Sequence, residues 1–125
     1  MNSKDKKPEI QEQEIVIDDV RETLIVALVE GELMGSVRLT YKDKRSASAH
    51  LMYVYQYYRR KGVGRLLIKA CCELALDGGC ETLGLLVSKT NKNAIGLYEA
   101  CGLSFAYEYD DGMLLMIKNI QGGLE

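Results

Sequence analysis

The chain has 125 residues, of which 47% are hydrophobic and 27% are charged, and its formal net charge is −2. This length and composition are typical of one globular domain. The near-neutral charge excludes a dedicated nucleic-acid-binding domain, which would be strongly basic.

The N-terminal region is mostly polar and charged, which predicts a loose tail over residues 1–14 and a single domain over residues 15–125. Residues 15–18 fit either a short strand or part of a helix. No signal-peptide pattern is visible, and the longest apolar runs are far shorter than a membrane span. We therefore expect a cytoplasmic protein with no membrane partner.

Beyond the tail, hydrophobic periodicity alternates between strand and helix patterns, with glycine-rich turns between them. The apolar run at residues 23–30 suggests a strand covered on both faces. In the strand at residues 47–55, simple alternation puts Ala49, Leu51 and Tyr53 on one face and His50 on the other. The predicted elements are strands at 23–30, 33–41 and 47–55, a helix from Gly62 to about Leu76, a strand at 82–87, a helix at about 91–100, and strands at 103–109 and 113–119. This β-β-β-α-β-α-β-β order predicts a mixed α/β fold with helices packed on one sheet.

The turn between the third strand and the first helix is basic and punctuated by Gly62 and Gly64. Such a turn presents unpaired main-chain N–H groups at the positive end of a helix dipole, where anions bind. Glycines let phosphate oxygens approach the main chain, and four side chains add positive charge: Arg59, Arg60, Lys61 and Arg65. The spacing matches neither a nucleotide P-loop nor a dinucleotide-binding turn. A phosphate or pyrophosphate ligand is the expected occupant.

Two motifs carry a family resemblance. The first is R-x-x-G-x-G at Arg59, Gly62 and Gly64, preceded by Val54. The second, at residues 91–103, reads NKNAIGLYEACGL and resembles N-x-x-A-x-x-L-Y-E-x-x-G-F with Leu103 at the final position. Together the motifs resemble the acetyl-CoA loop and the second signature of the GNAT superfamily of N-acetyltransferases, over roughly residues 23–117. The resemblance implies a mostly antiparallel sheet and direct transfer of acetyl from acetyl-CoA to a primary amine of a small molecule or peptide.

The resemblance also implies roles for individual residues. Main-chain groups of the third strand would pair with the pantetheine arm, and an N–H near Val54 would polarise the thioester carbonyl. Asn91 would contact the cofactor arm, although a helix N-cap explains it equally well. The full cofactor-binding set is Met52, Tyr53, Val54, Arg59, Arg60, Lys61, Gly62, Val63, Gly64, Arg65, Asn91 and Tyr98.

Two residues are candidates for proton transfer. Tyr98 occupies the position where the family usually carries its general acid, and a phenol can protonate a departing thiolate. Its competing role is an aromatic side chain packed in the core. His50 lies where the family often has a base for the amine, and imidazole suits that work, but a structural histidine is equally consistent. Glu30 and Glu108 are the fallback bases.

The cysteines and tyrosines do not indicate one particular function. Cys71, Cys72, Cys80 and Cys101 lack C-x-x-C spacing, so we expect core thiols and no metal site. A thiol or metal site on Cys71 and Cys72 is the weakest alternative. Four tyrosines between residues 53 and 58 suit core packing, an acceptor cleft or a subunit contact.

The family usually has a strand and two helices ahead of the equivalent of Thr23, where this sequence has twenty-two residues. The acceptor cleft is therefore expected to be open or completed by another subunit, which favours a homodimer. The alternative to an enzyme is a catalytically inactive acyl-CoA-binding or regulatory module of the same fold.

Overall fold

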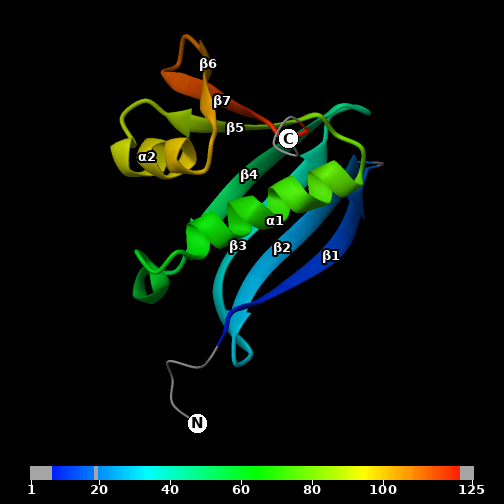
Figure 1. The fold of residues 1–125 in the computed structure, drawn as a ribbon, viewed down its shortest axis with the longest axis vertical. Coiled ribbons are helices and arrows are strands. Elements are labelled where there is room, and N and C mark those ends of the chain that lie inside the picture. Colours follow the sequence, from blue (N-terminus) through cyan, green and yellow to red (C-terminus); the bar gives the residue numbers. More distant parts are fainter. Residues whose placement is uncertain (1–6, 19, 122–125) are drawn as a thin grey trace.

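The computed structural model describes residues 7–18 and 20–121. Seven strands form one sheet in the order β1-β2-β3-β4-β5-β7-β6, with α1 across one face and α2 beside β5 (Figure 1). Neighbouring strands are antiparallel except β4 and β5, which are parallel. The elements are β1 (Glu9–Ile17), β2 (Val20–Val29), β3 (Glu32–Tyr41), β4 (Ser46–Val54), a short 3-10 helix (Gln56–Tyr58), α1 (Val63–Asp77), β5 (Thr82–Ser88), α2 (Lys92–Ala100), β6 (Ser104–Glu108) and β7 (Met113–Asn119).

The predicted order of strands and helices is present from β2 to β7, and one further strand precedes it. The prediction of a loose tail is wrong for residues 9–14, because β1 pairs with β2 along its whole length. Ile10 packs against the core, while main-chain pairing to β2 holds the polar residues of β1 at the sheet edge. The part of the predicted tail at residues 1–6 lies outside the described residues. Neither helix in the described ranges has the length and apolarity needed to cross a lipid bilayer.

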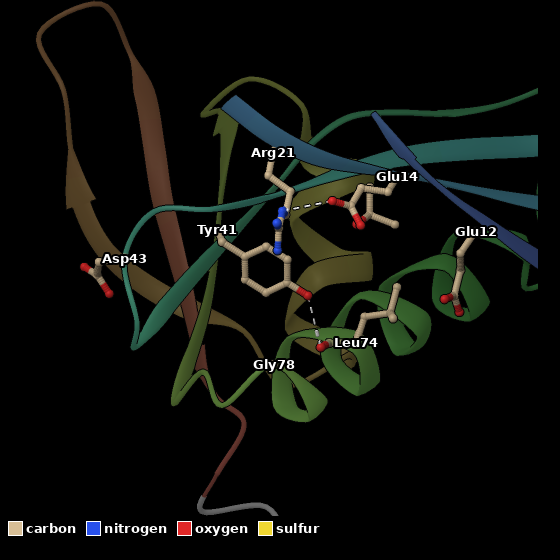
Figure 2. A pocket seen from close by; sticks show the side chains of 8 residues that line it. Glu12, Glu14, Arg21, Tyr41, Asp43, Leu74 and Gly78 are labelled. Atoms are coloured by element: carbon tan, nitrogen blue, oxygen red, sulfur yellow. Dashed lines mark hydrogen bonds and ion pairs between the residues drawn. The ribbon is translucent and has the colours of Figure 1, made fainter. Parts of the chain in front are cut away.

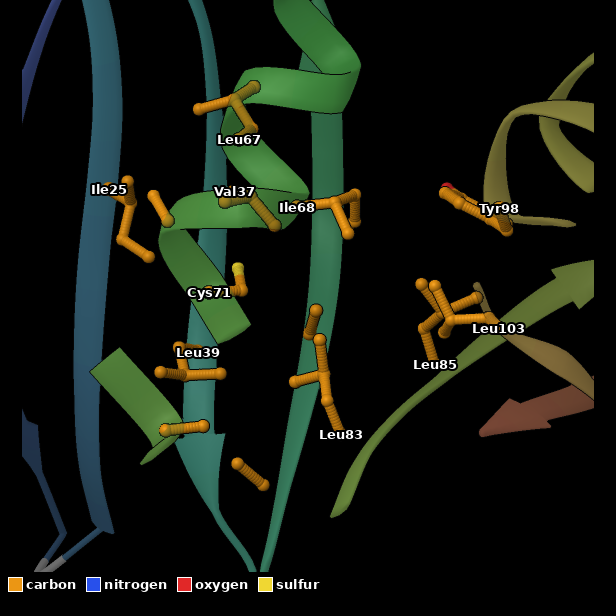
Figure 3. Close-up of a cluster of buried hydrophobic side chains, with 14 of the residues drawn as sticks. Ile25, Val37, Leu39, Leu67, Ile68, Cys71, Leu83, Leu85, Tyr98 and Leu103 are labelled. Atoms are coloured by element: carbon orange, nitrogen blue, oxygen red, sulfur yellow. The ribbon is translucent and has the colours of Figure 1, made fainter. Parts of the chain in front are cut away.

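The core lies between α1, α2 and one face of the sheet (Figure 3). Leu67, Ile68 and Cys71 of α1 are fully or almost fully buried against it. In β2 only Ile25 and Ala27 are buried, and the alternating apolar residues Leu24, Val26 and Leu28 are half-buried. The prediction that this strand is covered on both faces is therefore wrong, since α1 covers one face only.

A β-bulge at Leu51 changes the faces of β4. Arg38 pairs with His50 but Ser36 pairs with Tyr53, so β4 has one residue more than β3 between these pairs. Leu51 has a φ of 53°, a left-handed conformation unusual for a branched residue. Beyond the bulge the face assignment from simple alternation is wrong. Leu51 and Tyr53 are exposed, whereas Met52 and Val54 pack on the core side, as the buried Ala47 and Ala49 do.

The strands β4 and β5 separate halfway along their length. Their parallel pairing runs from Ser46 with Thr82 to Ala49 with Leu85 and then stops, although both strands continue. Figure 1 shows the two strands diverging from their paired ends. From His50 to Val54, the edge of β4 on the β5 side therefore pairs with no strand, and we call this stretch the open edge of β4.

Candidate active site

A cavity of about 680 Å³ lies where the end of β4, the first turn of α1 and the start of α2 meet. Residues of both sequence motifs line this cavity. Its lining comprises Val54, Tyr58, Arg59, Arg60, Gly62, Val63, Gly64, Arg65, Asn93, Ala94 and Leu97. We call this cavity the N-terminal cavity, after the end of α1 that it borders.

The main chain entering α1 offers unpaired hydrogen-bond donors to this cavity. Gly62 is the N-cap residue, with a φ of 84°, and as a glycine it has no side chain that could cap the helix. The first main-chain bond in this turn runs from the Leu66 N–H to the Gly62 carbonyl, at 3.0 Å. Within the described residues, the N–H groups from Arg60 to Arg65 have no acceptor. No acidic residue occupies the first turn of α1. This arrangement can bind a phosphate or pyrophosphate.

The predicted cationic residues differ in what they contact. Arg59 donates from Nε to the carbonyl oxygen of Val54 at 2.8 Å, so it also fixes the loop to the end of β4. Lys61 lies over the Tyr57 ring, at 4.4 Å from the centroid, and is not among the residues lining the N-terminal cavity. Arg60 and Arg65 line that cavity and form no ion pair with another described residue. They are the side chains most available to a bound anion.

Gly64 lies where the first turn of α1 packs against the Leu97 side chain of α2. A Cβ atom at this position would be 2.8 Å from Cδ2 of Leu97 and 3.8 Å from the Met52 methyl group. A larger residue would therefore force the Leu97 side chain to shift. Met52 thus lies behind the first turn of α1 rather than in the cavity lining.

At the start of α2, Asn91 and Asn93 have different contacts. The side-chain oxygen of Asn91 accepts a hydrogen bond from the Ala94 N–H at 3.2 Å, so the N-cap interpretation is confirmed. Asn93 lines the cavity instead of Asn91. Sequence reasoning missed Asn93, although it lies one helical turn before Leu97 and therefore on the same face of α2.

Tyr98 lies in the core between α1 and α2. Its side chain is 8% exposed and lies near Ile68, Leu85 and Leu103 (Figure 3). Its hydroxyl forms no hydrogen bond with another residue in the described ranges. Burial, with a smaller contribution from the thiol of Cys101, raises the pKa of Tyr98 above its ordinary value. The phenol therefore keeps its proton at neutral pH and can donate it.

His50 projects from the face of the sheet opposite α1, next to the last paired residue of β4. Its Nε2 atom is 2.6 Å from Oγ1 of Thr40 and 3.5 Å from Oε1 of Glu22. Of the fallback bases, Glu108 is paired with Lys89 at 3.3 Å. Sequence reasoning identified His50 but not its two partners, which come from other strands.

All four cysteines are free thiols. Cys71 and Cys80 are buried, as predicted, whereas Cys72 and Cys101 are partly exposed. Burial raises the pKa of Cys71 to about 12, so this thiol is neutral and unreactive. Within the part of the chain that the structure describes, no group of three or more metal-ligating side chains is found.

Comparison with known proteins gives concordant results. The model of the "Acetyltransferase (GNAT) family" matches residues 2–103. An acetyltransferase of Sodalis glossinidius is 32% identical over 96 residues, which cover 77% of this chain and 64% of that protein. A thialysine N-epsilon-acetyltransferase of Bos taurus is 47% identical over 70 residues, which cover 54% of this chain and 41% of that protein. The chain thus spans less than two thirds of these relatives.

Solved structures share the fold. A GNAT family acetyltransferase from Elizabethkingia anophelis with acetyl-CoA bound has a TM-score of 0.72 and 16% identity, covering 78% of this chain and 76% of that one. An N-acetyltransferase from Thermoplasma acidophilum in complex with coenzyme A has the same TM-score and 19% identity, covering 78% of this chain and 60% of that one. At these identities the likeness shows the fold alone.

Proposed function

Because the chain belongs to the GNAT acetyltransferase family, we propose that it transfers the acetyl group of acetyl-CoA directly to a primary amine. The observation that carries the proposal is the N-terminal cavity, where unpaired main-chain N–H groups and two free arginines meet the open edge of β4. This combination suits a ligand with a pyrophosphate at one end and an extended arm beyond it.

The donor would bind in two parts. Its pyrophosphate would accept hydrogen bonds from the N–H groups at the start of α1, with Arg60 and Arg65 adding charge. Its extended arm would lie along the edge of β4 from Met52 to Val54, as an added strand does at a sheet edge. Arg59 supports this arrangement because it ties the loop to Val54.

The chemistry needs a base, a nucleophile and an acid. His50 would remove a proton from the acceptor ammonium group, and the free amine would attack the thioester carbonyl. The new C–N bond forms as the C–S bond breaks, and the nitrogen releases its second proton to solvent. Tyr98 would give its proton to the departing thiolate, whose conjugate acid has an ordinary pKa of about 8.5, and would regain a proton from solvent. Burial raises the pKa of Tyr98 above its ordinary value, so the phenol holds its proton until the thiolate departs.

For the acceptor, we propose a small molecule with an unhindered primary amine on a flexible chain. The support is the bovine relative, whose name states that it acetylates the ε-amine of thialysine. Peptide amines remain the second group to test. The exposed rings of Tyr53 and Tyr55, on the surface beyond the bulge, would provide apolar contact for the chain of such an acceptor.

We also propose that the protein acts as a homodimer in the cytoplasm. Tyr57 is 76% exposed and Leu51 is 67% exposed, and both lie near the open edge of β4. Large exposed apolar side chains are enriched at subunit contacts. A monomeric mass in light scattering at micromolar concentration would contradict this part of the proposal.

The test is a panel of amines incubated with acetyl-CoA, in which released thiol and acetylated product are measured. The panel should include thialysine, lysine, polyamines and short peptides. Saturable acetylation of one amine is expected. If coenzyme A binds but no amine is acetylated, the inactive acyl-CoA-binding module becomes the better interpretation. If coenzyme A does not bind, both functions fail.

A further inference from the structure

Four polar side chains form a cluster on the sheet face opposite α1. Glu22 comes from β2, Arg38 and Thr40 from β3, and His50 from β4. Thr40 Oγ1 is 3.4 Å from Glu22 Oε1, and Arg38 Nη1 is 3.5 Å from Glu22 Oε2. With the two contacts of His50 Nε2, at 2.6 Å to Thr40 and 3.5 Å to Glu22, the cluster is continuous across three strands.

The number of available protons limits how these contacts can be arranged. An ionised carboxylate only accepts hydrogen bonds, and a threonine hydroxyl has one proton to donate. If Thr40 donates to Glu22, its oxygen can accept a proton from His50, which must then lie on Nε2. In the reverse arrangement, Thr40 donates to an unprotonated Nε2 and leaves Glu22 without that bond. The first arrangement satisfies every group and joins the ring to a carboxylate.

We propose that Thr40 and Glu22 are positioning residues that keep the proton of neutral His50 on Nε2, so that Nδ1 accepts the proton of the acceptor amine. This inference rests on the proposed function, in which His50 is the base. When Nδ1 takes the proton from the ammonium group, the ring becomes positively charged. Glu22 stays ionised and stabilises that charge, directly and through Thr40.

Burial and position agree with this division of roles. The Glu22 side chain is 16% exposed, whereas His50 is 37% exposed, so the carboxylate is sheltered and the ring is accessible to an acceptor. Arg38, which is 41% exposed, balances the charge of Glu22 in the resting state. His50 follows Ala49, the last residue of β4 that pairs with β5. The base therefore lies at the start of the open edge of β4, on the sheet face opposite the one against which Tyr98 packs.

Nitrogen NMR of the free protein can test the tautomer, because the chain has only one histidine. The neutral ring should show a protonated Nε2 and an unprotonated Nδ1. Thr40→Val should give a mixture of tautomers, whereas Thr40→Ser, which keeps the hydroxyl, should retain the native spectrum. A proton on Nδ1 in the native protein would overturn the proposal even if Thr40→Val failed to fold. An unchanged spectrum in folded Thr40→Val would also overturn it.

Kinetics provide the second measurement. Thr40→Val and Glu22→Gln should each lower kcat about tenfold, as loss of a hydrogen bond to a charged group does, without changing KM for acetyl-CoA. The matched control is Glu73→Gln, which removes an exposed carboxylate on α1 and should leave kcat unchanged. Equal kcat values for Glu22→Gln and the native protein would contradict the proposed role of Glu22 as a positioning residue. If no amine in the panel is acetylated, the proposed function fails, while the nitrogen spectra still decide the tautomer.

Discussion

The two ends of α1 each border a cavity, and the two cavities have opposite chemistry. The N-terminal cavity, of about 680 Å³, contains arginines and glycines. At the other end of the helix lies a cavity of about 550 Å³, the C-terminal cavity, shown in Figure 2. Its charged lining residues are mainly acidic, and the whole lining comprises Glu12, Glu14, Arg21, Thr23, Tyr41, Asp43, Leu74 and Gly78.

At the C-terminal cavity several polar groups already have partners. The carbonyl of Leu74 accepts hydrogen bonds from the Gly78 N–H at 3.0 Å and from the Tyr41 hydroxyl at 3.3 Å. Arg21 is paired with Glu14 at 2.9 Å. At the N-terminal cavity the main-chain donors have no partner among the described residues. Two cavities of similar volume therefore differ in what they can bind, because free donors and uncompensated charge attract a ligand whereas volume alone does not.

The same substitution, made at the candidate acid Tyr98 and at Tyr41 in the C-terminal cavity, should separate chemistry from stability most clearly. Tyr98→Phe should lower kcat about a hundredfold or more, since a positioned general acid contributes that much, with unchanged affinity for coenzyme A. Tyr41→Phe should leave kcat unchanged and lower the free energy of unfolding by about 1 kcal/mol through loss of its bond to Leu74. Steady-state kinetics and urea denaturation measure both effects. A similar loss of turnover in the two variants would contradict the assignment of Tyr98.

Charge reversal should have the next largest effect. Arg65→Glu should weaken coenzyme A binding about tenfold to a hundredfold, because it replaces a charged donor with a repelling group. Glu12→Lys, in the C-terminal cavity, should change the affinity by no more than about twofold, since salt screens a charge this remote. Titration calorimetry at low and high salt gives both numbers. Equal losses would mean that general charge, rather than the N-terminal cavity, controls binding.

Glycine substitutions offer a finer comparison. Gly62 and Gly79 both have positive φ values, 84° and 89°, and a Cβ atom at either position would meet nothing within 4 Å. Alanine at either position should therefore cost about 1 kcal/mol of stability through backbone strain alone. Only Gly62→Ala should also weaken coenzyme A binding, by a few-fold, because it changes the direction of the N–H groups. Urea denaturation and titration calorimetry measure the two effects. Equal affinities of Gly62→Ala and Gly79→Ala for coenzyme A would contradict the prediction.

The smallest expected difference concerns the two phenols in alkaline solution. Burial is the main cause of the raised pKa of both Tyr41 and Tyr98, but Glu12 and Glu14 add to the shift of Tyr41. The double variant Glu12→Gln/Glu14→Gln should lower the pKa of Tyr41 toward 10 and leave that of Tyr98 unchanged. Each raised pKa stabilises the fold below about pH 10, and this contribution is lost as pH rises through the folded value. Ultraviolet titration, with Tyr41→Phe and Tyr98→Phe as references, follows each phenol.

Local sequence patterns predicted much of the fold and the basic turn that borders the N-terminal cavity. The alternation in β3, the helical spacing from Val63 to Leu74 and the paired glycines after α1 each report an element through nearby residues. The basic turn before α1 and the second motif at α2 are likewise contiguous in sequence. Each pattern depends on a few neighbouring residues, so it could be recognised from the sequence without knowledge of the fold.

Local patterns failed where a residue depends on a partner far along the chain. The polar residues of β1 became a strand because the edge of β2 was available to pair with them. The bulge at Leu51 reversed the expected faces of β4, and no turn residue marked it. The separation of β4 from β5 is also invisible in either strand alone.

By itself the sequence determined the order of most elements, the basic glycine-containing turn and the candidate acid Tyr98, because these follow from residue type and short spacing. The tertiary structure alone decided that the turn faces α2 across a cavity and that Glu22 and Thr40 meet His50. It also decided which end of α1 has donors without partners. These features depend on strand register and helix packing, which bring together residues that no local pattern connects.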